Sequence, residues 1–353
     1  MKIYIRSSAN ISPQQTFKHQ AFPFKAVAYT GNILKAIEPD YKDIIDVKMV
    51  RRMSRIVKMG VAAALECLKN AGEESPGAIV TGTAYGCLSD TEQFLGSIIA
   101  LDEEMLSPTS FIQSTHNTVG AQIALLLQCN NYNNTFVNGG FSFESALLDA
   151  IMLLREQEVT NVLTGSVDEL TGLSYAILSR FGLYKRQQVS NMDLFATASK
   201  GTIAGEGAAF FLLASQPSPD DHAQLEGIAT FYKPGDTTEI ANHITAFLAA
   251  HSINATDIDL VITGKNGDIQ NDAHYDRLKE MIFIKNELIH YKHLCGDYPT
   301  AVSFAVWLAA NIIRTGQVPE GTGDRVSKAN KLQRILICNN YQNLHHSLIL
   351  ISA

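Results

Sequence analysis

Apolar residues along the chain occur in two spacings, which together predict alternating strands and helices. Short uninterrupted apolar runs are typical of buried strands, and longer stretches with apolar positions three or four apart are typical of helices. Strands are predicted at 78–83, 135–137, 161–165, 208–214, 260–264, 334–338 and 347–351. Helices are predicted at 50–70, 142–157, 239–251, 273–286 and 301–315. Because strands alternate with helices over short connections, the pattern favours a parallel α/β sheet.

The predicted helix at 50–70 indicates how one element packs. Three consecutive alanines at 62–64 permit a close approach by its neighbours, so we expect this helix to be buried between layers. Its polar side is expected to carry Arg51, Arg52 and Arg55.

A polar stretch with two prolines at 216–221 divides the pattern into two halves. After it, the alternation of strands and helices begins again in a shorter form. A single core stops growing near about 250–300 residues, and the chain has 353. We therefore predict two related halves, an N-terminal one over residues 1–215 and a C-terminal one over 222–353.

Composition and charge exclude several classes of protein. Hydrophobic residues make up 46% of the chain and charged residues 18%, the opposite of the balance in disordered chains. The net charge of −7 and the absence of a Lys/Arg tract argue against a nucleic-acid partner. No apolar run approaches the roughly 20 residues that span a bilayer, and the N-terminus has no apolar signal segment. We expect a cytoplasmic protein without a membrane partner.

The five cysteines predict neither a disulfide framework nor a zinc site. They are odd in number, scattered, and never in a Cys-x-x-Cys pair, which is typical of reduced thiols. They are Cys67, Cys87, Cys129, Cys295 and Cys338. We expect no metal and no cofactor.

The segment around Val137 has the layout of a nucleophile elbow. A predicted strand ends in Asn138-Gly139-Gly140, and a predicted helix begins at Ser142. The free N–H groups and dipole at a helix start stabilise an anion such as a thiolate. Turns of this kind occur throughout α/β proteins, so the pattern alone favours an ordinary crossover.

Four motifs along the chain resemble those of one known family. They are Arg-Arg-Met-Ser-Arg at 51–55, the glycine-containing strand and turn at 78–87, the strand end at 162–169, and Gly-Thr-Ile-Ala-Gly-Glu-Gly-Ala at 201–208. The last, containing Gly205, Glu206 and Gly207, is the most specific. It lacks the Lys-Ser/Thr of a phosphate-binding loop, so we expect close backbone packing there. The chain resembles the β-ketoacyl-acyl carrier protein synthases (ketosynthases) of the thiolase superfamily. The resemblance covers nearly the whole sequence and implies their five-layer α/β/α/β/α, thiolase-like fold.

The resemblance also identifies the positions at which this family places its catalytic residues. Its enzymes use a Cys at the elbow, to hold the acyl chain as a thioester, and two His residues. Here the matching positions are Phe141, Gly264 and Asp297. The family's Lys is retained as Lys292, and the aromatic residue of its gating loop matches Tyr341. A phenyl ring forms no thioester, so we expect no acyl condensation by the family's mechanism.

Several other residues are candidates for chemistry. Ser142 is an alternative nucleophile, but a position in the first turn of a helix is the simpler interpretation. Glu144 suits the dipole at the helix start and is expected to be structural. His345 and His346 are adjacent on a strand and point to opposite faces, which disfavours a two-His metal site. Because Lys292 and Asp297 both occupy former active-site positions, we hypothesise a buried salt bridge between them.

The resemblance implies a non-catalytic partner subunit of the chain-length-factor type. Such subunits pair with an active ketosynthase in type II fatty-acid or polyketide systems, including aryl polyene and flexirubin-type pigment pathways. The implied partners are a catalytic ketosynthase subunit or a second copy of the chain, together with an acyl carrier protein. Two alternatives remain open: a divergent acyltransferase or 3-oxoacyl synthase with a non-Cys nucleophile, and a protein that binds acyl groups or carrier proteins.

Overall fold

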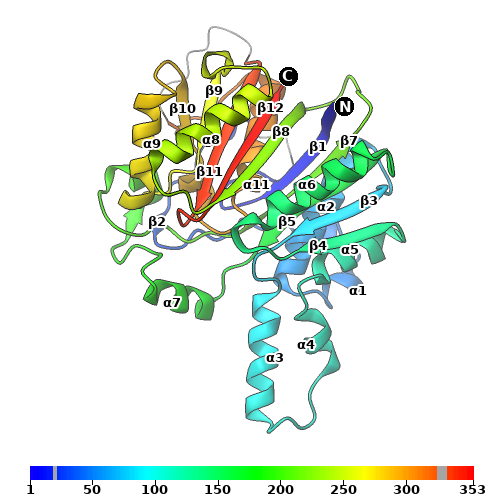
Figure 1. The fold of residues 1–353 in the computed structure, drawn as a ribbon. Helices are drawn as coiled ribbons and strands as arrows, with labels where there is room; N and C mark the ends of the chain where they lie inside the picture. Colours follow the sequence, from blue (N-terminus) through cyan, green and yellow to red (C-terminus); the bar gives the residue numbers. More distant parts are fainter. Residues whose placement is uncertain (19–21, 324–331) are drawn as a thin grey trace.

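Ten strands form one mixed sheet that is covered by helices (Figure 1). The computed structural model describes residues 1–18, 22–323 and 332–353. The strands are β1 Ile3–Ile11, β2 Thr30–Gly31, β3 Ala78–Gly82, β4 Tyr132–Phe136, β5 Asn161–Asp168, β6 Val189–Ser190, β7 Gly207–Ala214, β8 Ala223–Tyr232, β9 Leu260–Thr263, β10 Glu287–His290, β11 Arg334–Tyr341 and β12 His345–Ser352. The helices are α1 Val47–Val50, α2 Arg55–Ala71, α3 Leu88–Ala100, α4 Pro108–Gln113, α5 Thr118–Leu127, α6 Ser142–Arg155, α7 Gly172–Arg180, α8 Thr237–Ala250, α9 Ile269–Met281, α10 Lys292–Cys295 and α11 Val302–Thr315.

The order of the strands repeats across the sheet. It runs β10-β9-β11-β12-β8-β1-β7-β5-β3-β4, and β2 and β6 form a separate pair. Counted from each outer edge of the sheet toward its centre, the two groups of five strands have the same order: third, second, fourth, fifth and first along their half of the chain. The two groups meet where β1 pairs antiparallel with β8. This repetition agrees with two related halves, and the boundaries at 215 and 222 stay a prediction.

The predicted parallel pairing is found in part of the sheet only, because the sheet is mixed. β3 is parallel to β4 and β5, and β9 is parallel to β10 and β11. β7 and β12 run antiparallel to both of their neighbours. β11 and β12 are joined by only three residues, 342–344. A parallel crossover needs about a dozen residues or more, so this connection enforces an antiparallel pair.

Alternating side chains divide the core into layers. Phe210 of β7 packs with α2 and α5, while its neighbour Phe211 packs with α6 and α11. In the second half, Leu336 of β11 packs with α8 and α9, while Ile337 faces α6 and α11. Helices α6 and α11 therefore lie between the two groups of five strands, and helices α2, α5, α8 and α9 cover their outer faces. The chain thus has the expected five layers. Each fully buried aliphatic side chain contributes roughly 1.5–3 kcal/mol.

Several predicted boundaries differ from the structure. The predicted helix at 50–70 is two helices, α1 and α2, because the chain turns at 51–54 before Ser54 starts the second. α2 is largely buried, but it packs in an outer layer, against the sheet and α5. β4 begins three residues before the predicted strand. α9 covers 269–281 rather than 273–286, because the Asp268 carboxylate accepts hydrogen bonds from the Gln270 and Asn271 N–H groups and starts it early.

Two helices extend away from the sheet. Figure 1 shows α3 and α4 projecting together, and Phe94 packs against Phe111 between them with ring centroids 5.4 Å apart. α4 leads within a few residues into α5, which packs on β4. The sequence did not reveal this pair, because its apolar side chains have no core to face.

Among the helices of the described residues, none is long and apolar enough to cross a membrane. All five cysteine thiols are free and buried.

Candidate functional site

The elbow after β4 is a tight turn that requires its glycines. Residues Gly139–Phe141 form a single 3₁₀ turn, and α6 begins at the next residue. Gly139 has φ +54°, in the left-handed region that favours glycine. A Cβ on Gly140 would lie 2.8 Å from Cγ of His345, so the backbone and this imidazole are in close contact.

Ser142 closes this turn. Its Oγ accepts a hydrogen bond from the Asn138 N–H at 2.8 Å and donates one to the Gly139 carbonyl at 2.8 Å. The side chain is fully buried. Because both contacts are to the backbone, the hydroxyl is engaged in holding the start of α6.

Phe141 lies against an imidazole that the sequence reasoning did not place here. The rings of Phe141 and His345 meet edge to face, with centroids 4.7 Å apart. His345 begins β12, and its ring also contacts that of Tyr232, with centroids 5.3 Å apart. Burial lowers the pKa of His345. Only the pairing of β12 with β11 brings this residue to the elbow, and no local motif indicates that.

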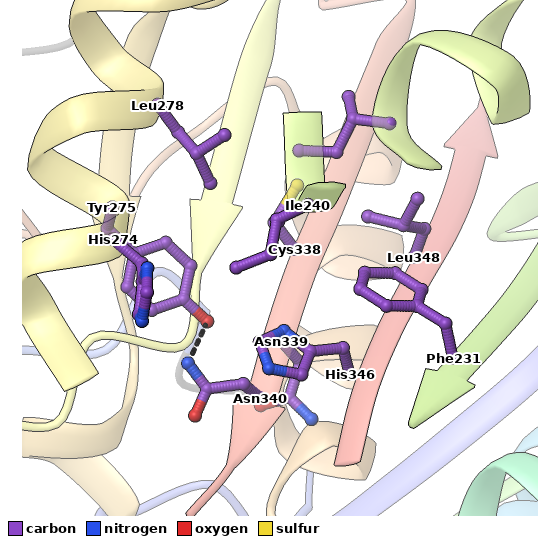
Figure 2. A pocket seen from close by; sticks show the side chains of 11 residues that line it. Phe231, Ile240, His274, Tyr275, Leu278, Cys338, Asn339, Asn340, His346 and Leu348 are labelled. Carbon is purple, nitrogen blue, oxygen red and sulfur yellow. Dashed lines mark hydrogen bonds between the residues drawn. The ribbon is translucent and has the colours of Figure 1, made fainter. Parts of the chain in front are cut away.

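The Gly264 position, just after β9, is already filled by its neighbours. A Cβ there would lie 2.8 Å from both Asn339 Oδ1 and the Tyr275 hydroxyl, and 3.0 Å from the Asn340 N. Figure 2 shows the Tyr275 hydroxyl accepting a hydrogen bond from Asn340 Nδ2, at 3.2 Å. An imidazole cannot be accommodated without moving these groups.

Lys292 and Asp297 form the buried salt bridge that the sequence suggested. The Lys292 Nζ lies 2.7 Å from Asp297 Oδ1, and the side chains are 1% and 5% exposed. The ammonium also donates to the Asn340 carbonyl at 2.6 Å. Asp297 Oδ2 accepts a hydrogen bond from Asn266 Nδ2 at 2.8 Å. These additional hydrogen bonds offset part of the cost of desolvating the two charges.

The segment expected to match a gating loop is a tight hairpin turn. Tyr341 is buried at the end of β11. Gln342 and Asn343 follow with φ +57° and +54°. The Leu344 N–H donates to the Tyr341 carbonyl at 3.1 Å, which closes the turn. The turn therefore places two residues other than glycine in the left-handed region.

Glu144 is a second site residue whose environment the sequence did not reveal. It is 1% exposed in the first turn of α6, and Ser347 Oγ of β12 donates to its Oε1 at 2.7 Å. Burial raises the pKa of Glu144 to about 7, although the Ser347 hydrogen bond and the Lys292 charge act in the opposite direction. In the described structure its Oε2 has no hydrogen-bond partner.

The end of β11 joins these residues into one region. Asn339 and Asn340 border the Gly264 position, the Asn340 carbonyl receives Lys292, and His345 pairs with Tyr341 across the hairpin. Through these contacts the structure brings the predicted positions 141, 264, 292, 297 and 341 around a single segment. The glycine motif at 205–207 lies apart from this segment, although its backbone supports Asp297: the Gly205 N–H donates to the Asp297 carbonyl at 3.3 Å.

Close backbone packing explains the two motif glycines. A Cβ on Gly205 would lie 2.1 Å from the Cys295 carbonyl oxygen, and one on Gly207 would lie 2.9 Å from the Ile11 carbonyl oxygen. No larger residue fits at either position without displacing backbone.

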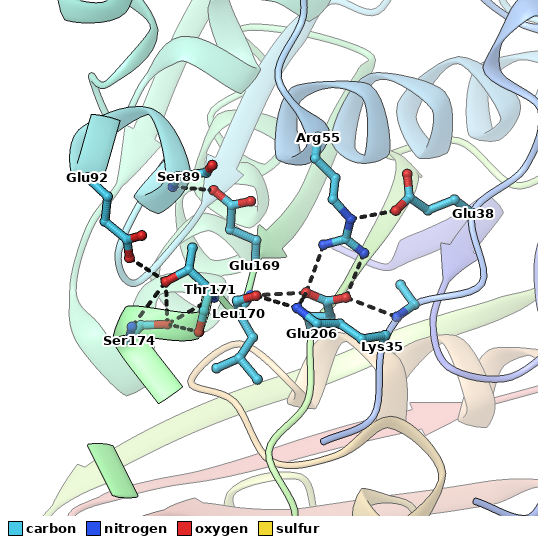
Figure 3. Close-up of polar contacts among 11 residues, drawn as sticks. Lys35, Glu38, Arg55, Ser89, Glu92, Glu169, Leu170, Thr171, Ser174 and Glu206 are labelled. Carbon is cyan, nitrogen blue, oxygen red and sulfur yellow. Dashed lines mark hydrogen bonds and ion pairs between the residues drawn. The ribbon is translucent and has the colours of Figure 1, made fainter. Parts of the chain in front are cut away.

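Glu206, between the two glycines, is the centre of an ion cluster (Figure 3). Arg55 donates to both of its oxygens, at 2.6 and 2.8 Å, and Lys35 Nζ lies 3.2 Å away. The N–H groups of Ala36 and Leu170 also donate to it, at 3.1 and 3.0 Å. The helix pattern predicted only that Arg55 lies on the polar side of its helix. In the structure, its guanidinium points into this ion cluster.

Comparisons with known proteins agree with this fold. Residues 34–183 match the family model of the β-ketoacyl synthase N-terminal domain. A protein from Streptomyces virginiae that bears the name "Putative polyketide beta-ketoacyl synthase 1" is 25% identical over 255 residues, 64% of this chain. The match spans 60% of that relative's length.

Solved structures resemble the chain over its full length. The ishigamide ketosynthase/chain length factor superposes with a TM-score of 0.79 at 18% identity, covering 100% of this chain and 99% of that one. A chain from the complex of a type II polyketide acyl carrier protein with its ketosynthase superposes with a TM-score of 0.75 at 14% identity, covering 100% of this chain and 99% of that one. Residues 34–183 thus match the β-ketoacyl synthase N-terminal domain, and the chain as a whole has the fold of these ketosynthase structures.

Proposed function

We propose that the chain is a non-catalytic, chain-length-factor-type subunit that pairs with an active ketosynthase in fatty-acid or polyketide biosynthesis. The observation that carries this proposal is the state of the three positions matching the family's catalytic residues. Phe141 supplies no nucleophile, the Gly264 position has no room for an imidazole, and Asp297 is engaged with Lys292. Without a nucleophile or an imidazole at these positions, neither a thioester nor the family's oxyanion contacts can form.

The two edges of the large sheet differ in a way that favours a partner at one of them. At the β10 edge, Ile289 pairs with Gly323, and the His290 N–H donates to the Thr322 carbonyl at 2.7 Å. In the described part of the chain, β4 pairs with β3 alone. Because proteins normally cover or pair a free edge, the uncovered β4 edge supports pairing with a second chain.

Exposed apolar side chains surround this same edge. Val137 is 46% exposed immediately after β4, and Leu125 of α5 is 62% exposed. The projecting pair α3–α4 and its connection add further exposed residues: Leu95, Ile99, Leu101, Met105, Phe111 and Ile112. Apolar surface of this extent is typical of protein interfaces. Similar chains occur in a ketosynthase/chain length factor structure and in a complex with an acyl carrier protein, which supports these two partner classes.

Co-expression with a cysteine-bearing ketosynthase encoded nearby tests the pairing. We expect a heterodimer in size-exclusion chromatography and native mass spectrometry. Val137→Glu is expected to weaken association at least tenfold, because it buries a charge at the β4 edge. Ile284→Glu is the matched control, since Ile284 is 66% exposed after α9, in the other half of the chain. Equal association of both variants with the partner would argue against the β4 edge.

Intact mass spectrometry with acyl donors distinguishes the remaining alternatives. The chain alone is expected to gain no covalent acyl group. An acyl adduct on Ser142, abolished in Ser142→Ala, would instead support a divergent acyltransferase and overturn the proposal. A homodimer that binds acyl groups and associates with none of the ketosynthases tested would favour the alternative that the chain is an acyl-binding protein.

A further inference from the structure

The net negative charge of the chain comes from one segment. Residues 70–154 contain nine acidic side chains and neither Lys nor Arg, so their formal charge is −9, whereas that of the whole chain is −7. The rest of the chain therefore carries a formal charge of +2. The nine acidic residues are Glu73, Glu74, Asp90, Glu92, Asp102, Glu103, Glu104, Glu144 and Asp149.

This acidic segment, residues 70–154, also forms the surface around the β4 edge. It contains β3, α3, α4, α5, β4 and all but the last residue of α6. Figure 1 shows α5 beside β4, and below both the arm formed by α3, α4 and their connection at 101–107. On α6, Leu148 and Met152 are 36% and 54% exposed. The exposed apolar side chains of the proposed interface and the net negative charge therefore belong to the same part of the chain.

Carboxylates lie both at the tip of the arm and beside β4. Asp102, Glu103 and Glu104 follow one another in the connection of the arm, and all three are exposed. Asp149 of α6 accepts a hydrogen bond from the hydroxyl of Tyr132, on β4 itself, at 3.0 Å. A partner that covers this surface therefore faces acidic groups.

Two exposed arginines lie where the arm joins the rest of the protein. Gln113, the last residue of α4, donates a hydrogen bond to the Arg52 carbonyl, and Arg51 is next to it in the chain. Helix α3 has 13 residues, and at a rise of about 1.5 Å per residue it is about 20 Å long. The tip therefore lies beyond the roughly 10 Å over which charges interact in about 0.1 M salt. These arginines do not neutralise the carboxylates of the tip.

A symmetric contact through the β4 edge would place the acidic segment against itself. In a two-fold dimer, the same patch of each subunit forms the interface, so both copies would bring a segment with a formal charge of −9 to it. Like charges that face each other across an interface oppose association. A different chain with Lys or Arg side chains at the facing positions would meet these carboxylates with the opposite charge.

We propose that the β4 edge and the arm disfavour a second copy of this chain and bind a chain of the same fold whose facing surface carries Lys and Arg residues. The inference rests on the proposed function, which supplies the edge and the class of partner, and it adds the charge of the partner's surface. Apolar side chains are buried in either kind of dimer, whereas the charges distinguish the two.

The salt dependence of association tests the sign of this charge effect. Analytical ultracentrifugation is carried out on the chain alone and on its complex with the ketosynthase. Between about 0.05 and 0.5 M NaCl, we expect the heterodimer to weaken by at least about fivefold, because salt screens attraction between opposite charges. Any self-association of the chain alone is expected to strengthen over the same range, because salt screens repulsion.

The outcomes separate this inference from the proposed function. A heterodimer whose Kd does not change with salt would contradict the inference alone, and so would a homodimer that is tighter than the heterodimer in dilute salt. The absence of a heterodimer at every salt concentration would contradict the proposed function and, with it, this inference.

Removing the charges of the arm provides a second test. The triple variant Asp102→Asn, Glu103→Gln, Glu104→Gln neutralises three exposed carboxylates with little change in shape. In dilute salt, we expect it to bind the ketosynthase at least about threefold more weakly than the wild type and to depend less on salt. Its self-association is expected to be stronger than that of the wild type.

The matched control neutralises three exposed carboxylates outside the acidic segment. The triple variant Asp220→Asn, Glu280→Gln, Glu320→Gln changes the net charge by the same amount. We expect it to associate with the ketosynthase as the wild type does. Equal effects of the two triple variants would show that net charge, rather than the charge of this surface, determines the pairing, and would overturn the proposal.

Discussion

Glu206 and Glu144 are both almost completely buried, yet their surroundings have opposite effects on their charge. Glu206 lies between α2 and the start of β7, where Arg55, Lys35 and two backbone N–H groups donate to its oxygens. Glu144 lies between the halves and accepts a hydrogen bond from Ser347 on one oxygen only. Burial acts to raise the pKa of both. At Glu206 the Arg55 hydrogen bonds and charge outweigh burial and lower the pKa, whereas at Glu144 burial dominates.

The difference indicates which buried charge holds the fold together. Glu206 lies in the motif at 201–208 that resembles one of the ketosynthases, and both of its carboxylate oxygens accept hydrogen bonds. The Glu144 carboxyl lies in the region of the positions that match the ketosynthase catalytic residues, and its Oε2 has no hydrogen-bond partner among the described residues. We therefore expect replacement of Glu206 and replacement of Glu144 to change the free energy of unfolding by different amounts and with different pH dependences.

The largest effect is expected from Glu206→Ala. Removing the carboxylate leaves the Arg55 guanidinium without its main partner, and breaking a buried pair costs about 3–5 kcal/mol. Urea unfolding followed by circular dichroism measures the loss. The control, Glu104→Ala, removes an exposed carboxylate of the α3–α4 connection and is expected to change stability by less than about 0.5 kcal/mol. A similarly small change in Glu206→Ala would contradict the structural role of the cluster.

The next effect is the contribution of Glu144 to the pH dependence of stability, which has the opposite sign to that of Glu206. Its pKa is raised to about 7 in the fold, against about 4.3 in an unfolded chain. The folded state therefore keeps the proton longer, and stability is lost as the pH rises through about 7. The expected loss between about pH 5 and pH 8.5 is about 3 kcal/mol. Glu206 has a lowered pKa, so its contribution is lost only as the pH falls through that lower value.

Glu144→Gln isolates this contribution. The amide is neutral at every pH, so the variant is expected to match the wild type near pH 5 and to exceed its stability near pH 8.5. Urea unfolding at both pH values gives the difference between the two proteins, in which the titrations of all other groups cancel. A difference that does not change with pH would show that Glu144 is already charged in the folded state near pH 5.

Ser347→Ala is expected to have an intermediate effect. At about pH 8.5 the charged carboxylate loses its hydrogen bond, which costs about 1.5–3 kcal/mol, whereas at about pH 5 the neutral carboxyl loses about 0.5–1.5 kcal/mol. Ser303→Ala is the matched control, because its buried hydroxyl donates to the neutral Thr300 carbonyl at 2.9 Å. Its cost is expected to be the same at both pH values. Equal costs for Ser347→Ala would contradict a charge-dependent contact.

The sequence predicted elements better than it predicted contacts. The apolar runs at β7 and β9 and the periodicity of α6 and α11 located those elements to within a few residues, because burial imposes its pattern locally. The family resemblance, which placed Lys292 and Asp297 at former active-site positions, also led to the prediction of their ion pair. In contrast, His345 reaches the elbow only because β12 folds back on β11, and Glu144 meets Ser347 only because α6 lies between the halves. Such contacts join residues some two hundred positions apart, as the hydrogen bond between Glu144 and Ser347 does, and no local pattern encodes them.

The smallest effect is expected from Lys35→Met. This variant tests whether the more exposed partner of Glu206 stabilises the fold less than Arg55 does. The Lys35 side chain is 52% exposed, whereas that of Arg55 is 32% exposed and contacts both carboxylate oxygens. Exposed ion pairs contribute about 0–1 kcal/mol and are screened by salt. Methionine keeps most of the apolar stem, so the change isolates the ammonium. Urea unfolding in dilute buffer is expected to show a loss of less than about 1 kcal/mol, which disappears at about 1 M salt. A loss comparable to that of Glu206→Ala would mean that Lys35, rather than Arg55, compensates the buried carboxylate.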